Sequence, residues 1–324
     1  MPDRLALVFP GQGSQYVGMG LDLCAQYSEA RSVFDEADTA LGFGLSKLCF
    51  EGPEEELNDT INTQPALLTV CIATLRTMGK LDQVGVVSSV AGHSLGEYTA
   101  LVAAGKVSFG DALRLVRERG RLMKEAGEQR PGGMAAVLGL PAESVVEACA
   151  VARQETATIV QVANINSPGQ VVISGERRGL DRAIELVQHQ GARRVVPLAV
   201  SIASHSVLME SASEGLREAL NGIEFRETDT PVVGNVTGKP LLDSDAIREE
   251  LTKQVVSPVQ WVASVLWMLE HGAKTFVEIG PKDTLSKLIK HIDSNVDRVC
   301  IGDASAVGKW RSSAVHQRPL AGEA

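Results

Sequence analysis

Short apolar runs alternate with longer segments of mixed character along most of the chain. Each run is about the length of a strand that is covered on both faces, so buried strands are predicted at 5–9, 84–90, 232–236 and 275–279. Helices are predicted between them, among others at 28–41, 64–78, 98–104, 109–125 and 245–255. This alternation predicts an α/β protein.

The middle of the chain has a different pattern. From Gly133 to Val200 the predicted order is strand, helix, strand, strand, helix, strand, with the turn Asn166-Ser167-Pro168-Gly169 between the central strands. This order is that of a split ferredoxin-like unit. We therefore expect a small subdomain at 129–197, inserted into a large subdomain formed by 1–128 and 198–303. Residues 304–324 are rich in Ala, Ser and Gly and are expected to form a flexible tail.

Composition narrows the class of protein. The 324 residues are 44% hydrophobic and 22% charged, and the net charge of −9 argues against a general nucleic-acid binder. No apolar run is long enough to span a bilayer, and the N-terminus lacks the pattern of a signal peptide. The five cysteines are scattered and have no metal-ligand spacing. We expect a cytoplasmic globular enzyme that uses no metal, membrane or nucleic acid.

The strongest chemical motif is Gly92-His93-Ser94-Leu95-Gly96-Glu97, which lies between a predicted strand and a helix of small residues. Strand, G-x-S-x-G and helix together indicate a nucleophile elbow. Glycines flank such a turn because a side chain would clash with the neighbouring strand or helix. The Ser94 hydroxyl is then exposed at the positive end of a helix, and the Leu95 amide is available to a developing oxyanion.

The loop after the first strand, Pro10 to Gln15, is also rich in glycine. Its third glycine is misplaced for a dinucleotide motif, and no P-loop lysine follows, so phosphate binding is disfavoured. The loop still presents backbone N–H groups at the carboxyl end of a strand, where ligands bind in open α/β sheets. The alternative is a tight turn with Gln12 on the surface.

Two further side chains are candidates for chemistry. Arg119 lies on the inward face of the 109–125 helix, between Leu115 and Met123. A core-facing arginine needs a partner, which is either a buried Asp or Glu in a structural ion pair or a substrate carboxylate. His205 follows a predicted strand and precedes a helix, a junction where binding groups are common, although its position alone does not establish a role.

Several motifs together resemble one family, the malonyl-CoA:acyl carrier protein transacylases and the acyltransferase domains of polyketide synthases. The resemblance covers roughly residues 4 to 303 and implies an α/β-hydrolase-like large subdomain with a ferredoxin-like insert. The motifs, in the family's order, are Phe9-Pro10-Gly11-Gln12-Gly13-Ser14-Gln15, Gly92-His93-Ser94-Leu95-Gly96-Glu97, Arg119-Gly120, Asn166-Ser167-Pro168-Gly169-Gln170, Ser204-His205, Pro258-Val259-Gln260-Trp261 and Glu278-Ile279-Gly280-Pro281.

The resemblance also implies the roles of single residues. Ser94 is the expected nucleophile, and His205 is the expected base and acid. The amides of Leu95 and Gln12 are expected to form the oxyanion hole. Arg119 is expected to hold the malonyl carboxylate.

Two further positions are implied less directly. Gln254 matches the position whose main-chain carbonyl orients the histidine, in place of an aspartate. Asn166 matches a position in the substrate cleft.

The implied reaction is a ping-pong transfer of malonyl from malonyl-CoA, through Ser94, to the phosphopantetheine thiol of acyl carrier protein. No bound cofactor is expected, and the protein is expected to be a monomer. An acidic carrier requires a local basic patch on this acidic chain. Candidates, each of which is equally an ordinary solvated charge, are Arg177-Arg178, Arg193-Arg194, Lys287 and Lys290.

The resemblance leaves alternatives open. The carrier can serve fatty-acid synthesis, or polyketide synthesis with a free-standing, trans-acting acyltransferase. Ile202-Ala203-Ser204-His205 differs from the His-Ala-Phe-His of malonyl-selective polyketide domains, which leaves methylmalonyl acceptance open. A serine esterase or thioesterase shares the elbow but usually places its acid and histidine late in the chain, whereas His205 comes 111 residues after Ser94. A non-catalytic carrier-binding module does not require both Ser94 and His205.

Overall fold

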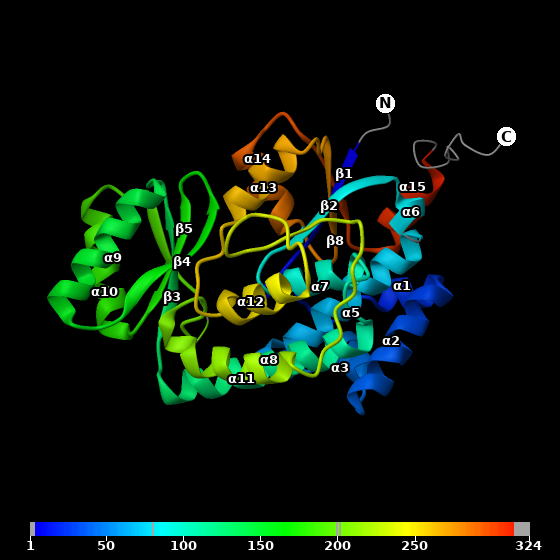
Figure 1. Cartoon of the computed structure of the whole chain (residues 1–324), viewed down its shortest axis with the longest axis horizontal. Helices are drawn as coiled ribbons and strands as arrows, with labels where there is room; N and C mark the ends of the chain where they lie inside the picture. Colours follow the sequence, from blue (N-terminus) through cyan, green and yellow to red (C-terminus); the bar gives the residue numbers. More distant parts are fainter. Residues whose placement is uncertain (1–3, 80, 199, 201, 314–324) are drawn as a thin grey trace.

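The computed structural model describes residues 4–79, 81–198, 200 and 202–313 and contains two sheets, each with its own helices (Figure 1). The larger sheet is parallel, with the strand order β7-β2-β1-β8-β9. Its strands are β1 (Arg4–Phe9), β2 (Val86–Gly92), β7 (Val232–Val233), β8 (Thr275–Ile279) and β9 (Asp297–Ile301).

Side chains of β1 alternate between two apolar cores. Leu5, Leu7 and Phe9 enter one core, while Ala6 and Val8 enter another on the opposite face. The first core receives side chains from α2 (Ser28–Leu41), α5 (Thr60–Met78), α7 (Leu95–Ala103), α8 (Phe109–Gln129), α11 (Glu210–Leu220) and α12 (Ser244–Gln254). The second receives them from α13 (Trp261–Glu270) and α14 (Thr284–Ile292). Cover on both faces explains why the strands read as continuous apolar runs.

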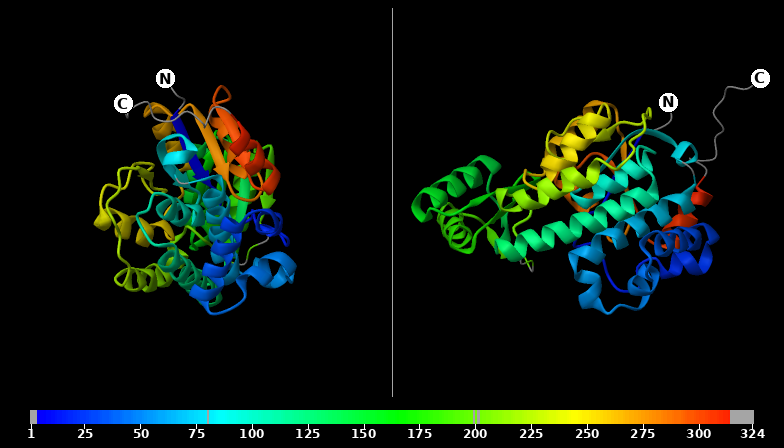
Figure 2. Two further views of the ribbon diagram at one scale, coloured as in Figure 1. Left: turned by 90° about the vertical axis from the view of Figure 1, so that its right-hand side faces the viewer. Right: turned by 60° about the horizontal axis from the view of Figure 1, so that its bottom comes forward.

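The smaller sheet forms a lobe at one end of the molecule, seen in green at the left of Figure 1 and again in the right-hand view of Figure 2. Its strands are antiparallel in the order β4-β5-β3-β6. They are β3 (Gly133–Leu138), β4 (Val160–Ser167), β5 (Gln170–Gly175) and β6 (Arg194–Pro197), with the helices α9 (Ala142–Thr156) and α10 (Arg177–His189). The predicted βαββαβ order is confirmed; the exact subdomain limits stay a prediction.

Strand β4 connects the smaller lobe to the rest of the molecule. The Ile165 amide donates to the Val259 carbonyl at 2.9 Å, and the Val259 amide donates to the Ala163 carbonyl at 2.9 Å. The smaller lobe is thus hydrogen-bonded to the loop that leads into α13. The remaining elements are α1 (Leu21–Gln26), α3 (Leu45–Glu51), α4 (Glu54–Asn58), α6 (Leu81–Val84), a 3₁₀ turn (Val207–Met209) and α15 (Ala304–Ser312).

Two sequence-based expectations are wrong. The strand predicted at 232–236 ends at Val233, and the next residues form a loop that matters for the site described below. The tail predicted from residue 304 begins with α15, which buries Val307 completely and leaves Trp310 only 7% exposed. Residues 314–324 lie outside the described part. Among the described residues, no helix is both long and apolar enough to cross a membrane.

Candidate active site

The nucleophile elbow connects β2 to α7 at the carboxyl edge of the larger sheet. Ser94 has φ 52° and ψ −105°, a conformation that costs a non-glycine residue about 1–3 kcal/mol. The flanking glycines make the turn possible, because a Cβ on Gly92 would lie 1.9 Å from the Gly96 carbonyl carbon, and one on Gly96 would lie 2.0 Å from the Phe9 carbonyl oxygen. The elbow predicted from the sequence is therefore present.

Ser94 and His205 form a hydrogen-bonded pair. The Ser94 Oγ lies 2.9 Å from His205 Nε2, and His205 Nδ1 lies 2.8 Å from the main-chain carbonyl oxygen of Gln254. Because that carbonyl can only accept, Nδ1 carries the proton and Nε2 is free to accept from the serine. Burial and the nearby Arg119 charge lower the pKa of His205 to about 3. The imidazole is therefore neutral near pH 7, as a general base must be.

Arg119 is 2% exposed and reaches the same hydroxyl from α8. Its Nη2 donates to Ser94 Oγ at 3.1 Å and to Gln254 Oε1 at 2.9 Å. Its Nη1 donates to Gln64 Oε1 at 2.8 Å. All three acceptors are uncharged, so the structural ion pair considered from the sequence is not what the described residues form. Burial lowers the pKa of Arg119, but an arginine remains protonated. A buried cation thus adjoins the serine without a carboxylate bonded to it.

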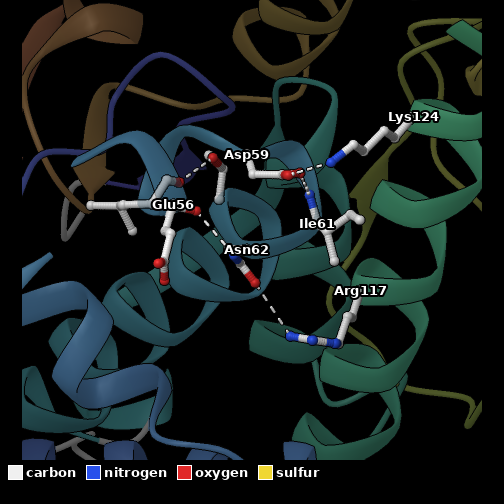
Figure 3. A network of polar contacts seen from close by, with 8 residues as sticks. Glu56, Asp59, Ile61, Asn62, Arg117 and Lys124 are labelled. Atoms are coloured by element: carbon white, nitrogen blue, oxygen red, sulfur yellow. Dashed lines mark hydrogen bonds and ion pairs between the residues drawn. The ribbon is translucent and has the colours of Figure 1, made fainter. Parts of the chain in front are cut away.

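Polar contacts connect α5, which carries Gln64, to α8, which carries Arg119 (Figure 3). Asp59 caps α5 by accepting from the Ile61 amide at 3.1 Å and also pairs with Lys124 of α8 at 2.6 Å. Within α5, Asn62 accepts from Arg117 of α8 at 3.4 Å. These contacts connect α5 with α8, the two helices from which Gln64 and Arg119 extend toward each other.

The loop Pro10–Gln15 lies directly against the elbow. A Cβ on Gly11 would approach the His93 carbonyl oxygen to 2.4 Å, which only glycine avoids. The Gln12 side chain accepts from Thr60 at 3.0 Å, and Lys282 donates to the Gly13 carbonyl at 2.8 Å. Leu95 is the first residue of α7, so its N–H has no acceptor within the helix. The arrangement suits an oxyanion hole made of the Gln12 and Leu95 amides.

Asn166 lies beside the elbow at the end of β4. Its Oδ1 is 2.8 Å from His93 Nε2, so the partner of Asn166 in this structure is the histidine that precedes the nucleophile. The His93 ring in turn lies 5.8 Å from the Trp261 ring. Asn166 therefore connects the smaller lobe to the elbow, and its role toward a substrate stays a proposal.

Three buried polar residues of the site were missed from the sequence. Gln64 binds Arg119, as described above. Glu97 accepts from Gln254 Nε2 at 2.8 Å and from the Asn235 amide at 3.1 Å, while Asn235 contacts the elbow directly. Burial raises the pKa of Glu97 well above its usual range, and the neighbouring Glu250 raises it further. The available signal was the glutamate within the elbow motif itself, since Gln64 begins a largely apolar predicted helix and Asn235 lies in the strand predicted at 232–236.

Comparison with known proteins agrees with this geometry. Residues 6–316 match the acyl transferase domain family. The chain is 44% identical over 305 residues to the malonyl CoA-acyl carrier protein transacylase of Bacillus subtilis, covering 94% of this chain and 95% of that protein. It is also 44% identical over 308 residues to the transacylase of the same name from Escherichia coli K12, covering 94% and 97%.

Solved structures give the same result. The malonyl CoA-acyl carrier protein transacylase of Coxiella burnetii superposes with a TM-score of 0.91 at 38% identity, covering 95% of this chain and 97% of that one. A malonyl-transacylase in complex with its type II polyketide synthase acyl-carrier protein superposes with a TM-score of 0.90 at 42% identity, covering 95% and 98%. The fold and the serine–histidine pair, together with these matches, define an acyltransferase. The chain belongs to the malonyl CoA-acyl carrier protein transacylase family.

Proposed function

We propose that this acyltransferase moves the malonyl group from malonyl-CoA to the phosphopantetheine thiol of acyl carrier protein through an ester on Ser94, and so supplies extender units for fatty-acid synthesis. The observation that carries the proposal is the position of Arg119, whose Nη2 is 3.1 Å from Ser94 Oγ. A guanidinium binds a carboxylate bidentately, and burial strengthens that interaction. A malonyl carboxylate on Arg119 places its thioester carbonyl near the serine.

In the first half-reaction His205 Nε2 takes the Ser94 proton as Oγ attacks the thioester carbon. The oxyanion accepts hydrogen bonds from the Gln12 and Leu95 amides, which are preorganised and cost no rearrangement. Collapse of the tetrahedral intermediate breaks the carbon–sulfur bond, and the histidine returns its proton to the CoA thiolate. Holding the acyl group by its carboxylate before attack lowers the barrier by several kcal/mol, on the order of what orientation supplies in such reactions.

The second half-reaction runs in reverse with a different thiol. His205 takes the proton of the phosphopantetheine thiol, the thiolate attacks the malonyl ester, and the proton returns to Ser94. Arg119 keeps the carboxylate throughout, so the acyl group does not move between the two steps. Acetyl-CoA lacks that carboxylate and leaves the buried guanidinium unpaired, which disfavours it as a donor.

The carrier requires an exposed basic surface on this acidic chain. Among the candidates, Arg177 pairs with Asp181 at 3.3 Å and Lys287 pairs with Asp283 at 2.7 Å. Arg193 and Arg194 are exposed where edge strand β6 begins, which favours them as carrier contacts.

Transfer of a labelled malonyl group from malonyl-CoA to acyl carrier protein tests the proposal. The wild-type chain is expected to label the phosphopantetheinylated carrier but not the carrier without that arm, and Ser94→Ala is expected to label neither. Release of free malonate and CoA without labelling of the carrier would instead identify a thioesterase. Equal labelling of the carrier by wild type and Ser94→Ala would show that Ser94 is not the nucleophile.

A further inference from the structure

Asn235 lies in the loop after β7 and is completely buried against the elbow. Its Oδ1 accepts from the Ser94 amide at 2.7 Å, and its Nδ2 donates to the Gly92 carbonyl at 2.7 Å. The two partners fix the orientation of the amide, because an N–H only donates and a carbonyl only accepts. One side chain therefore bridges the residues on either side of His93.

The backbone of Asn235 is held just as firmly. Its N–H donates to Glu97 Oε2 at 3.1 Å, and its carbonyl accepts from the Gln260 amide at 2.7 Å. The same Glu97 oxygen accepts from Gln254 Nε2, and Gln254 binds Arg119 and the Ser94 carbonyl. Glu97 lies in the first turn of α7, so the elbow, Gln254 and the Asn235 loop meet at one carboxyl group.

The Asn235 side chain bridges the two ends of the turn that holds Ser94 in a strained backbone conformation. Ser94 is held at φ 52°, and without a tie on both sides the turn can relax toward ordinary backbone angles. By occupying the Ser94 N–H, Asn235 also leaves the Leu95 N–H as the amide of the elbow that faces a reacting group. We propose that Asn235, held in place by Glu97, is a positioning residue that keeps the Ser94 hydroxyl aligned with His205 and the Leu95 amide aligned with the oxyanion.

This proposal rests on Ser94 being the nucleophile, and Asn235→Asp tests it. The substitution keeps the shape and the acceptor for the Ser94 amide, but it sets an oxygen against the Gly92 carbonyl in place of a donor. Ser264→Ala is the matched control. Ser264 of α13 is also buried, and its hydroxyl donates at 3.2 Å to the carbonyl of Gly234, the residue before Asn235, and not to the elbow. Thermal unfolding of both variants measures the purely structural effect.

The readout is the rate constant for acylation of Ser94 at saturating malonyl-CoA, beside the rate of reaction with a small fluorophosphonate. We expect Asn235→Asp to slow both about 10²-fold, the cost typical of misplaced reacting groups, with half-saturation by malonyl-CoA unchanged. Ser264→Ala is expected to stay within about threefold of wild type on the same scale. Equal rates in Asn235→Asp and Ser264→Ala would overturn the proposal.

A second pair of variants covers the case in which Asn235→Asp does not fold. Glu97→Gln keeps an oxygen that accepts from Asn235 and Gln254, so near wild-type acylation is expected, whereas Glu97→Ala is expected to be slow. If Glu97→Ala acylates as fast as Glu97→Gln, the proposal fails. If wild type reacts with the fluorophosphonate but not with malonyl-CoA, the proposed function fails while the role of Asn235 is still decided by the fluorophosphonate rates.

Discussion

Gln254 holds His205 through its main chain and Arg119 through its side chain. The Gln254 carbonyl accepts from His205 Nδ1 at 2.8 Å, and its Oε1 accepts from Arg119 Nη2 at 2.9 Å. A carbonyl orients the imidazole here in place of the usual carboxylate and brings no negative charge to it. Substitution of the side chain therefore separates the two roles, because the carbonyl remains in every variant.

Gln254→Ala is expected to impair recognition of malonyl-CoA more than the nucleophile. Loss of a hydrogen bond to a charged group is worth about 1.5–3 kcal/mol, so KM for malonyl-CoA is expected to rise roughly tenfold or more. Reaction of Ser94 with a fluorophosphonate is expected to fall by a smaller factor, because His205 keeps its contact with the Gln254 carbonyl although the Nε2 bonds to the Ser94 carbonyl and Glu97 are lost. Steady-state kinetics and labelling check this. An equal loss in both assays would show that the side chain also supports the serine–histidine pair.

Arg119→Ala is expected to lose malonyl transfer selectively. Removing one partner of a buried charge pair costs about 2–5 kcal/mol, which corresponds to roughly 30- to 5,000-fold in kcat/KM for malonyl-CoA. Acylation by acetyl-CoA is expected to fall far less or to rise, because no unpaired guanidinium remains. Arg119→Lys keeps the charge without the planar fork and is expected to recover only part of the loss. If malonyl-CoA and acetyl-CoA lose rate equally, Arg119 does not hold the carboxylate.

The pH dependence of kcat/KM is expected to lack an acidic limb near pH 6.5. Burial and the Arg119 charge lower the pKa of His205 to about 3, so the base stays neutral from pH 8 to about 5. The same pKa shift makes the stability of the fold depend on pH. In the unfolded chain the His205 side chain binds a proton below its ordinary pKa of about 6.5, whereas in the folded chain it stays neutral down to a pKa of about 3. The free energy of unfolding therefore declines as the pH falls from about 6.5 toward 3.

Initial rates with malonyl-CoA between pH 5 and 8 measure the first effect, and urea unfolding of wild type and His205→Gln measures the second. A rate that halves near pH 6.5 would contradict the environment described for His205. An identical pH slope of stability in wild type and His205→Gln would contradict its neutral burial.

Helix α15 is expected to be part of the folded core rather than an appendage. Trp310 is 7% exposed, and the helix begins where the Ala304 amide donates to Asp22 at 2.7 Å. Trp310→Ala is expected to lower the free energy of unfolding by about 3–5 kcal/mol, as for other large-to-small core changes. Removal of 314–324 is the comparison, and removal of 304–324 is expected to give a lower urea midpoint than it, because the longer truncation also deletes α15. Equal urea midpoints for both truncations would show that α15 does not stabilise the fold.

Local patterns were sufficient to predict much of this molecule. Two glycines around Ser94, the inward position of Arg119 and the βαββαβ order each follow from spacing and sterics within a short segment. The pairing of Ser94 with His205 could not be derived in this way, because it depends on two chain segments meeting across the sheet edge. It entered through the family resemblance.

What the sequence left unpredicted has physical reasons. Asn235 lies inside the strand predicted at 232–236, and nothing local shows that its side-chain amide bridges Gly92 and Ser94. Trp310 lies in a segment of small residues whose periodicity is weak, and its burial depends on the core that α15 covers. In both cases a distant partner determines the structure.

Intact-protein mass spectrometry after brief mixing with malonyl-CoA shows whether Ser94 carries the malonyl group. We expect an adduct of one malonyl group on Ser94 that added phosphopantetheinylated carrier discharges. The adduct is expected to be absent in Ser94→Ala, and acetyl-CoA is expected to form its own adduct poorly. An adduct on another residue, or free malonate accumulating without any adduct or carrier product, would contradict this expectation.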